Sequence, residues 1–538
     1  MSGYVFEHYG QRVVVDTGGQ VIRAELEDQY YGHEPATALH PSVASVGLGS
    51  DFTPMMALAA KSKAFDDRLM ARLEGLLHHG VAEHEGLYAL VEWIRAQLPP
   101  KTKARGLLDA ASCLGQGTQP EWSRDTLPMR RWLKDFRRDA SRSQPLGIYT
   151  QSEDLERLFK HDRILQSRLD PDVAEPIAQV LRAAPERMAA YRAHLALIAR
   201  ITGPLALPSV LEEPVMGLGV ALLPASDSAE GRLVKELLGG RPAPEGFELG
   251  AEVAQRIRDG RLPTQPTPDD GWYAHQFHAN AALLFPETEG LRIGPRYAEQ
   301  LEDVFKALFA LDRETHVKQL ECPVGAGIPP LVVAPRLTVE PVPEHYARRA
   351  DAYRFLREQL VGLLGEVVVY GASVDGYGAS LGDALVEMEA VFRGAALIVW
   401  EELGHPRERS AERDAARALF RAWQRRSVED PDLALDMRIA VPLHHDPERG
   451  TVTISAMIGL TSTPLGLEFV ERPGVHVHGG DELDAREPDF QSLTVSILSA
   501  STLECEVKVP PTRERLRAIC DQARTPRAIK AALQKDLR

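Results

Sequence analysis

The chain has 538 residues, of which 44% are apolar and 26% are charged, and its formal net charge is −15. This length predicts two to four domains, and the apolar share is ordinary for a globular protein with a buried core. Nucleic acid is not expected as a partner, because its binding depends on basic surface.

Membrane and secretory signals are not expected in this sequence. The longest apolar runs have about six residues, such as Ala395 to Trp400, whereas a membrane-spanning helix needs roughly 20. The first residues, Met1 to His8, lack the basic and apolar regions of a signal peptide. The four cysteines show no C-x-x-C spacing, which favours reduced thiols. We therefore expect a cytoplasmic protein without a membrane span.

Residues 1–50 are predicted to form a short β-hairpin followed by an irregular segment. Gln11 to Asp16 and Gln20 to Leu26 have the pattern of strands, and Gly18-Gly19 between them is a typical hairpin turn. The following residues up to Ser50 are rich in Gly, Pro, Ser and His without a period.

Residues 51–322 are predicted to form a helical domain. Apolar residues recur there at three- and four-residue intervals. The clearest helical patterns cover Phe65–His79, Glu83–Leu98, Pro128–Ala140, Ser152–Leu165, Glu230–Leu238, Leu249–Asp259, Gly271–Phe285 and Pro295–Leu311. Another pattern starts at Asp170-Pro171 and is interrupted at Pro185, after which a further helix continues to about Ile201. Residues 323–343 are rich in proline and glycine, which predicts a connector after this domain.

Residues 344–430 are predicted to form a region of long helices. The β-branched run from Val367 to Tyr370 predicts a buried strand. Ser380 and Asp383 then form a capping-box pattern at the start of a helix that continues to about Leu403. Because this helix is apolar on several sides, we expect it to be central to the fold.

Residues 431–538 are predicted to form a small α+β domain. Strands are expected at Arg438–Leu443, Thr451–Leu460, Gly466–Val470, Ser492–Leu498 and Glu504–Val509, followed by two short helices. The predicted fold class is therefore mainly α with a small antiparallel β-sheet near the C-terminus, an α+β fold.

One pair of histidines suggests a metal site. His275 and His278 are three residues apart on a predicted helix, where their imidazoles share one side with small residues. Two imidazoles and a carboxylate from elsewhere can bind a divalent transition metal, and Glu287 and Glu289 follow nearby. The alternative is two surface or cleft histidines with ordinary hydrogen bonds.

Two further clusters of histidine and aspartate carry a weaker signal for metal. They are His444-His445-Asp446, and His476, His478 and Asp481. Alternate residues of a strand point to the same side, so each cluster offers two adjacent donors. Neither cluster has an evident third partner.

Two hypotheses about function follow. The first is a soluble intracellular binding or assembly protein, because no complete catalytic constellation is visible and helices offer grooves for partner segments. Its expected partner is another protein, with a small molecule as the alternative. The second hypothesis is a metal-dependent enzyme, hydrolytic or oxidative, that uses His275 and His278. The sequence leaves open whether the protein is an enzyme.

Overall fold

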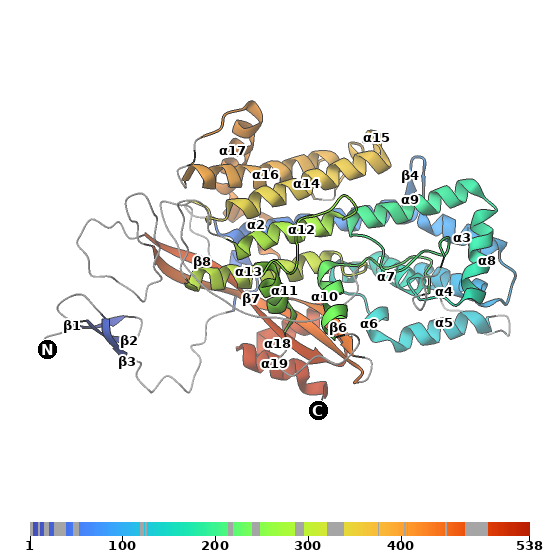
Figure 1. Ribbon diagram of the computed structural model, residues 1–538, viewed down its shortest axis with the longest axis horizontal. Coiled ribbons are helices and arrows are strands. Elements are labelled where there is room, and N and C mark those ends of the chain that lie inside the picture. The colour runs from blue at the N-terminus through green and yellow to red at the C-terminus, as the bar shows by residue number, and fades with distance from the viewer. Residues whose placement is uncertain are drawn as a thin grey trace.

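The fold is α+β, as predicted (Figure 1). The computed structural model describes the chain apart from residues 1–3, 9–10, 16–20, 26–38, 47–52, 119–122, 124–125, 214–218, 239–247, 286–294, 320–337, 375, 403–404, 406, 447–448, 468–492, 524 and 538. None of the helices in the described part is long and apolar enough to cross a membrane.

Helix α2, Met55–His79, is the central element. Almost every residue of this helix is buried, including charged residues on several sides. Figure 1 shows helices α14, α16 and α17 along one side of the molecule and the C-terminal sheet on the opposite side. The helix beginning at Leu381 was expected to be central. This helix, α16 (Leu381–Glu402), supplies residues from Leu381 to Val399 to the main core. It lies in the outer layer, however (Figure 1), and its Val386 and Glu387 are exposed.

The outer layer consists of α14 (Pro343–Leu364), α16 and α17 (Ala411–Gln424). The predicted N-cap of α16, Ser380, is present, but the Asp383 carboxylate bonds the Ser380 hydroxyl and not its backbone N–H as in a complete capping box. Ser380 Oγ accepts the N–H of Asp383 at 3.1 Å and donates to the Asp383 carboxylate at 2.6 Å. The predicted end of this helix at Gly404 lies outside the described residues.

The predicted strand at Val367 to Tyr370 is wrong, because this run forms the short helix α15 (Glu366–Val369). Gly365, with a φ of 84°, turns the chain after α14. The N–H groups of Val369 and Tyr370 then bond the carbonyls of Gly365 and Glu366 at 3.1 and 2.8 Å. Strand propensity depends on pairing with neighbouring strands, and this segment packs beside helices instead.

The C-terminal sheet has three antiparallel strands in the order β6–β7–β8. They are β6 (Ile439–Asp446), β7 (Thr451–Leu467) and β8 (Leu493–Val507). Predicted strands therefore merge: residues 451–460 and 466–467 belong to β7, and residues 493–498 and 504–507 belong to β8. Helices α18 (Arg513–Gln522) and α19 (Pro526–Leu533) follow, as predicted.

The N-terminal hairpin is also present. Strands β2 (Gln11–Val15) and β3 (Val21–Glu25) pair antiparallel, and β1 (Tyr4–His8) adds a third strand beside β2. The remaining elements are α1 (Val43–Val46), β4 (Gly80–Val81), β5 (His84–Glu85), α3 (Leu87–Gln97), α4 (Lys103–Gln116), α5 (Leu127–Arg138), α6 (Ala140–Ser143), α7 (Glu153–Leu165), α8 (Pro171–Arg182), α9 (Pro185–Ile201), α10 (Ala229–Leu238), α11 (Leu249–Arg258), α12 (Trp272–Ala281) and α13 (Pro295–Thr315).

The main hydrophobic core includes residues from Val43 to Ala500 and surrounds α2. It draws side chains from the predicted segments 51–322, 344–430 and 431–538 alike. A second core lies among α3, α4, α5, α8 and α9, and a third lies between the sheet and helices α18 and α19. The domain boundaries stay a prediction.

Candidate functional site

The predicted metal ligands His275 and His278 lie on α12 and make ordinary contacts. The His275 ring stacks on Phe355 with centroids 3.9 Å apart, and His278 Nδ1 lies 3.2 Å from Thr264 Oγ1. Burial lowers the pKa of both imidazoles, that of His278 to about 4. Within the described part of the chain, no third ligand group joins this pair. Glu287 and Glu289 lie outside the described residues, so a metal at this pair stays a prediction.

The weaker histidine clusters gain no support either. His444, His445 and Asp446 lie at the end of β6 as predicted, and burial lowers the pKa of His444. The second cluster, His476, His478 and Asp481, lies outside the described residues.

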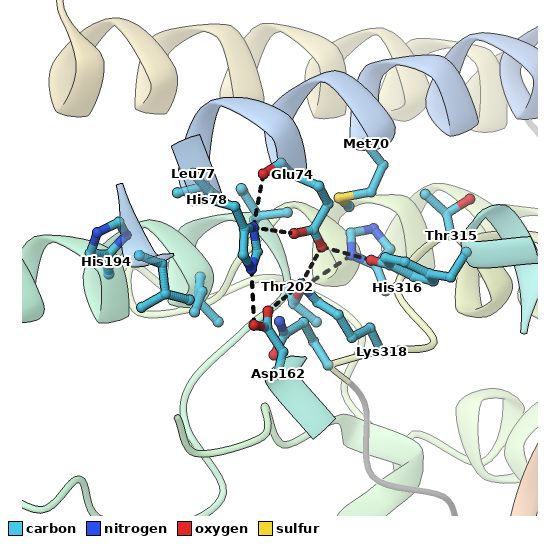
Figure 2. Close-up of a pocket in the computed structure, with 15 residues that line it drawn as sticks. Met70, Glu74, Leu77, His78, Asp162, His194, Thr202, Thr315, His316 and Lys318 are labelled. Atoms are coloured by element: carbon cyan, nitrogen blue, oxygen red, sulfur yellow. Dashed lines mark hydrogen bonds and ion pairs between the residues drawn. The ribbon is translucent and has the colours of Figure 1, made fainter. Parts of the chain in front are cut away.

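The structure brings together a different set of polar side chains beneath α2 (Figure 2). Figure 2 shows Glu74 and His78 pointing from α2 toward Asp162 of α7 and toward Lys318, which follows α13. We call this set the buried polar cluster; its members are Glu74, His78, Tyr149, His161, Asp162 and Lys318. All six side chains are buried.

Asp162 is the hub of the buried polar cluster. Its Oδ1 atom lies 2.9 Å from His78 Nε2 and 2.8 Å from His161 Nδ1, and its Oδ2 atom accepts a hydrogen bond from Lys318 at 2.8 Å. Lys318 Nζ is also 2.5 Å from Glu74 Oε1, to which Tyr149 donates its hydroxyl at 2.7 Å. These contacts form one continuous network.

The ion pairs in this network favour the charged forms of Asp162 and Lys318. Burial alone would raise the pKa of Asp162, but His78 and Lys318 outweigh it and hold that pKa well below its usual range. Burial likewise disfavours the charged form of Lys318, yet Asp162 and Glu74 raise its pKa above the ordinary value. Burial lowers the pKa of His161, which keeps this imidazole neutral.

The ring of His78 contacts α2 on one side and Asp162 on the other. Its Nδ1 atom is 2.9 Å from the carbonyl oxygen of Glu74, and its Nε2 atom is 2.9 Å from Oδ1 of Asp162. Both neighbours of the ring are oxygen atoms that accept hydrogen bonds. These two contacts fix the orientation of the imidazole beneath α2.

The same cluster contains donors that suit a transition metal. Ligand atoms of His78, His161 and Asp162 lie within 4.8 Å of one another. Three protein ligands and a backbone carbonyl that orients His78 are features of metal sites.

A narrow cavity of about 20 Å³ is lined by the members of this cluster other than His161, together with His194, Thr202 and His316 among others. That volume is roughly enough for one water molecule. The buried polar cluster therefore has no room for an organic substrate in this conformation.

A second candidate site is an exposed apolar surface around α15. Four of the eight large apolar side chains that are exposed in the described residues lie there; they are Leu363 (37%), Val367 (88%), Tyr370 (43%) and Val386 (39%). Figure 1 shows α15 at one end of the α14–α16 pair. The Tyr370 ring lies against Gly382, so α15 packs against the start of α16. Val386 follows Gly382 by one helical turn. We call these four side chains the α15 surface.

The segment that carries the α15 surface is acidic throughout. Between Glu358 and Val391 the sequence has six acidic residues and no lysine, arginine or histidine. Glu366, Asp383 and Glu387 in this segment are exposed. Arg357, just before it, pairs with Glu389 at 3.0 Å.

Comparisons with known proteins give this chain no relatives. No protein-family model, no curated protein and no solved structure matches it.

Proposed function

We propose that the chain is a binding or assembly protein whose α15 surface holds a segment of a partner protein. The observation that carries this proposal is the cluster of four exposed apolar side chains on one end of a helical pair. Contiguous exposed apolar surface with a polar rim is typical of interaction sites. Val367 is the centre of the proposed contact, because 88% of its surface is exposed.

Charge selects the kind of partner. A segment with six acidic and no basic residues attracts basic chains and repels acidic ones. We therefore propose a basic, amphipathic segment that lays apolar residues on the α15 surface, in the manner of a helix in a groove. The described cysteines, Cys113, Cys505 and Cys520, are unbridged. This agrees with a reducing compartment, and we propose the cytoplasm.

Site-specific cross-linking tests the proposal. A photoreactive residue at position 367 of the full chain, expressed in its own host cells, should link to one partner through a segment rich in basic and apolar residues. The linkage should weaken as salt rises, because exposed charges are screened. The photoreactive residue placed at position 428 is the matched control. Val428 is also exposed, at 61%, but it lies outside the α15 surface.

Three results would contradict the proposal. They are a cross-link from position 367 to a second copy of this chain, a cross-link to an acidic segment, and equal yields from positions 367 and 428.

A second candidate, metal-dependent catalysis, is favoured by the donor set of His78, His161 and Asp162. We place it second because Lys318 already neutralises part of this cluster. Metal analysis of the purified protein separates the candidates. Stoichiometric metal that is lost in His161→Ala would support the buried site, and metal lost only in the double variant His275→Ala/His278→Ala would support the predicted pair.

A further inference from the structure

An open cleft lies on the other side of Tyr88 from the buried polar cluster. It has a volume of about 690 Å³ and lies between α2, the start of α7 and residues of α3 and α4. Tyr88 lines the cleft, and its ring also contacts His78 and His161, with centroids 5.0 and 4.8 Å apart. Three guanidinium groups line it, those of Arg68, Arg72 and Arg157, and we call it the arginine cleft.

Two of these arginines already have acidic partners. Arg68 Nη1 donates to Asp432 at 2.8 Å, and Arg157 pairs with Glu153 at 2.5 Å and Asp154 at 3.4 Å. Asp154 also lines the cleft, but its side chain is 90% exposed. The Asp432 partner of Arg68 is buried, whereas both partners of Arg157 are exposed, so these carboxylates offset part of the charge of the two arginines.

Arg72 is different. Among the described residues, its guanidinium has no hydrogen-bond or ion-pair partner, and its Nε atom is closed off from solvent. The side chain is half-buried, so solvent does not fully compensate this charge. Buried donors are almost always satisfied, and a guanidinium presents a planar fork that fits carboxylate or phosphate oxygens. The group that would satisfy the guanidinium of Arg72 is therefore an oxyanion.

The size of the cleft indicates more than a bare ion. Small-molecule sites have volumes of roughly 300–1,000 Å³, and the arginine cleft falls in this range. Ala71 and Gly75 of α2 line the cleft, and these small residues leave space within it. A Cβ atom at Gly75 would meet nothing within 4 Å. The aromatic ring of Tyr88 offers an apolar wall.

We propose that the arginine cleft binds a small organic molecule through a phosphate or carboxylate group, which pairs with Arg72. This site is separate from the α15 surface, and its ligand need not involve the partner protein. The two oxyanions share one binding chemistry, so the test includes both.

Calorimetric titration of the full chain with pyrophosphate and with citrate tests the proposal. We expect one of these probes to bind at one site per chain, and Arg72→Gln to weaken that binding about ten- to hundredfold, which is the usual effect of removing a charge-assisted hydrogen bond. Arg192→Gln, at an exposed arginine of α9 outside the cleft, is the matched control and should bind as the wild type does.

Gly75→Glu is a second variant that does not remove an arginine. It places a carboxylate in open space above the cleft floor, so α2 should fold normally while the anion is repelled. Normal melting curves verify that both variants are folded. The proposal is overturned if neither probe binds the wild type, or if Arg72→Gln and Gly75→Glu bind the probe as tightly as the wild type.

Discussion

The Nζ atom of Lys318 lies 2.8 Å from Oδ2 of Asp162, although 156 positions separate the two residues in the chain. Both side chains are 2% exposed. The ion pair ties α7 to the segment after α13, directly beneath α2. Breaking it would leave an uncompensated charge in a buried site.

Lys318→Met should therefore destabilise the protein strongly. The carboxylates of Glu74 and Asp162 would remain buried without their ammonium partner, which costs about 3–5 kcal/mol. Urea unfolding at neutral pH measures this loss. Lys103→Met is the control, because Lys103 and its partner Asp172 are 62% and 56% exposed. It should cost far less than Lys318→Met, because exposed ion pairs contribute little to stability. Equal losses for the two variants would contradict the burial of the Lys318 pair.

Asp66 should make the free energy of unfolding decrease as the pH rises. Burial, together with the charge of Asp312, raises the pKa of Asp66 to about 7 although Arg349 opposes it. The ordinary value is 3.8. Between these values the folded protein holds a proton that the unfolded chain releases, so the free energy of unfolding falls as the pH rises.

Comparison with Asp66→Asn isolates this contribution. Asparagine does not titrate, so the variant should gain stability relative to the wild type as the pH rises from about 4 to about 7. Urea unfolding of both proteins at each pH provides the measurement. A constant difference between them across this range would show that Asp66 has the same pKa in both states.

Two helical glycines should respond to alanine in opposite ways. At Gly394 of α16 a Cβ atom would overlap the carbonyl oxygen of Ala416 in α17 and lie 2.7 Å from Phe420 Cβ. Gly394→Ala should therefore push the helices apart and cost about 1–3 kcal/mol. At Gly75 of α2 there is open space, so Gly75→Ala should stabilise the helix by about 0.5–1 kcal/mol. Thermal melting of both variants provides the measurement. Melting temperatures that shift in the same direction would contradict this prediction.

Local patterns in the sequence were sufficient for much of the secondary structure. The hydroxyls of Ser152 and Ser380 cap the helices that follow them, as residue types at helix starts suggest. The fold class followed from such signals, because helix periodicity and capping act within a few residues. The strand predicted at Val367 failed because strand formation depends on a neighbouring strand, which local sequence does not reveal.

The buried charges of α2 were beyond sequence reasoning. Lys61 pairs with Asp430, which is 369 positions away, and Asp66 pairs with Arg349, which is 283 positions away. Polar residues spaced around a helix predict a solvated face unless their partners are known. The buried polar cluster was missed for the same reason, since His78 and Asp162 are 84 positions apart. Spacing along the sequence indicates His275 and His278 instead.

The last prediction tests whether α15 is a helix with one exposed side. Val367 is 88% exposed and Val369 is fully buried. In a strand, these two residues would point to the same side and be buried or exposed together. Val367→Asp should change the free energy of unfolding by less than about 0.5 kcal/mol. Val369→Asp should cost about 3–5 kcal/mol, because it buries a carboxylate and removes core packing. Urea unfolding measures the free energy of unfolding of the two variants. Similar large losses in both would support a buried strand at this position, and Val367 would then not belong to the proposed docking surface.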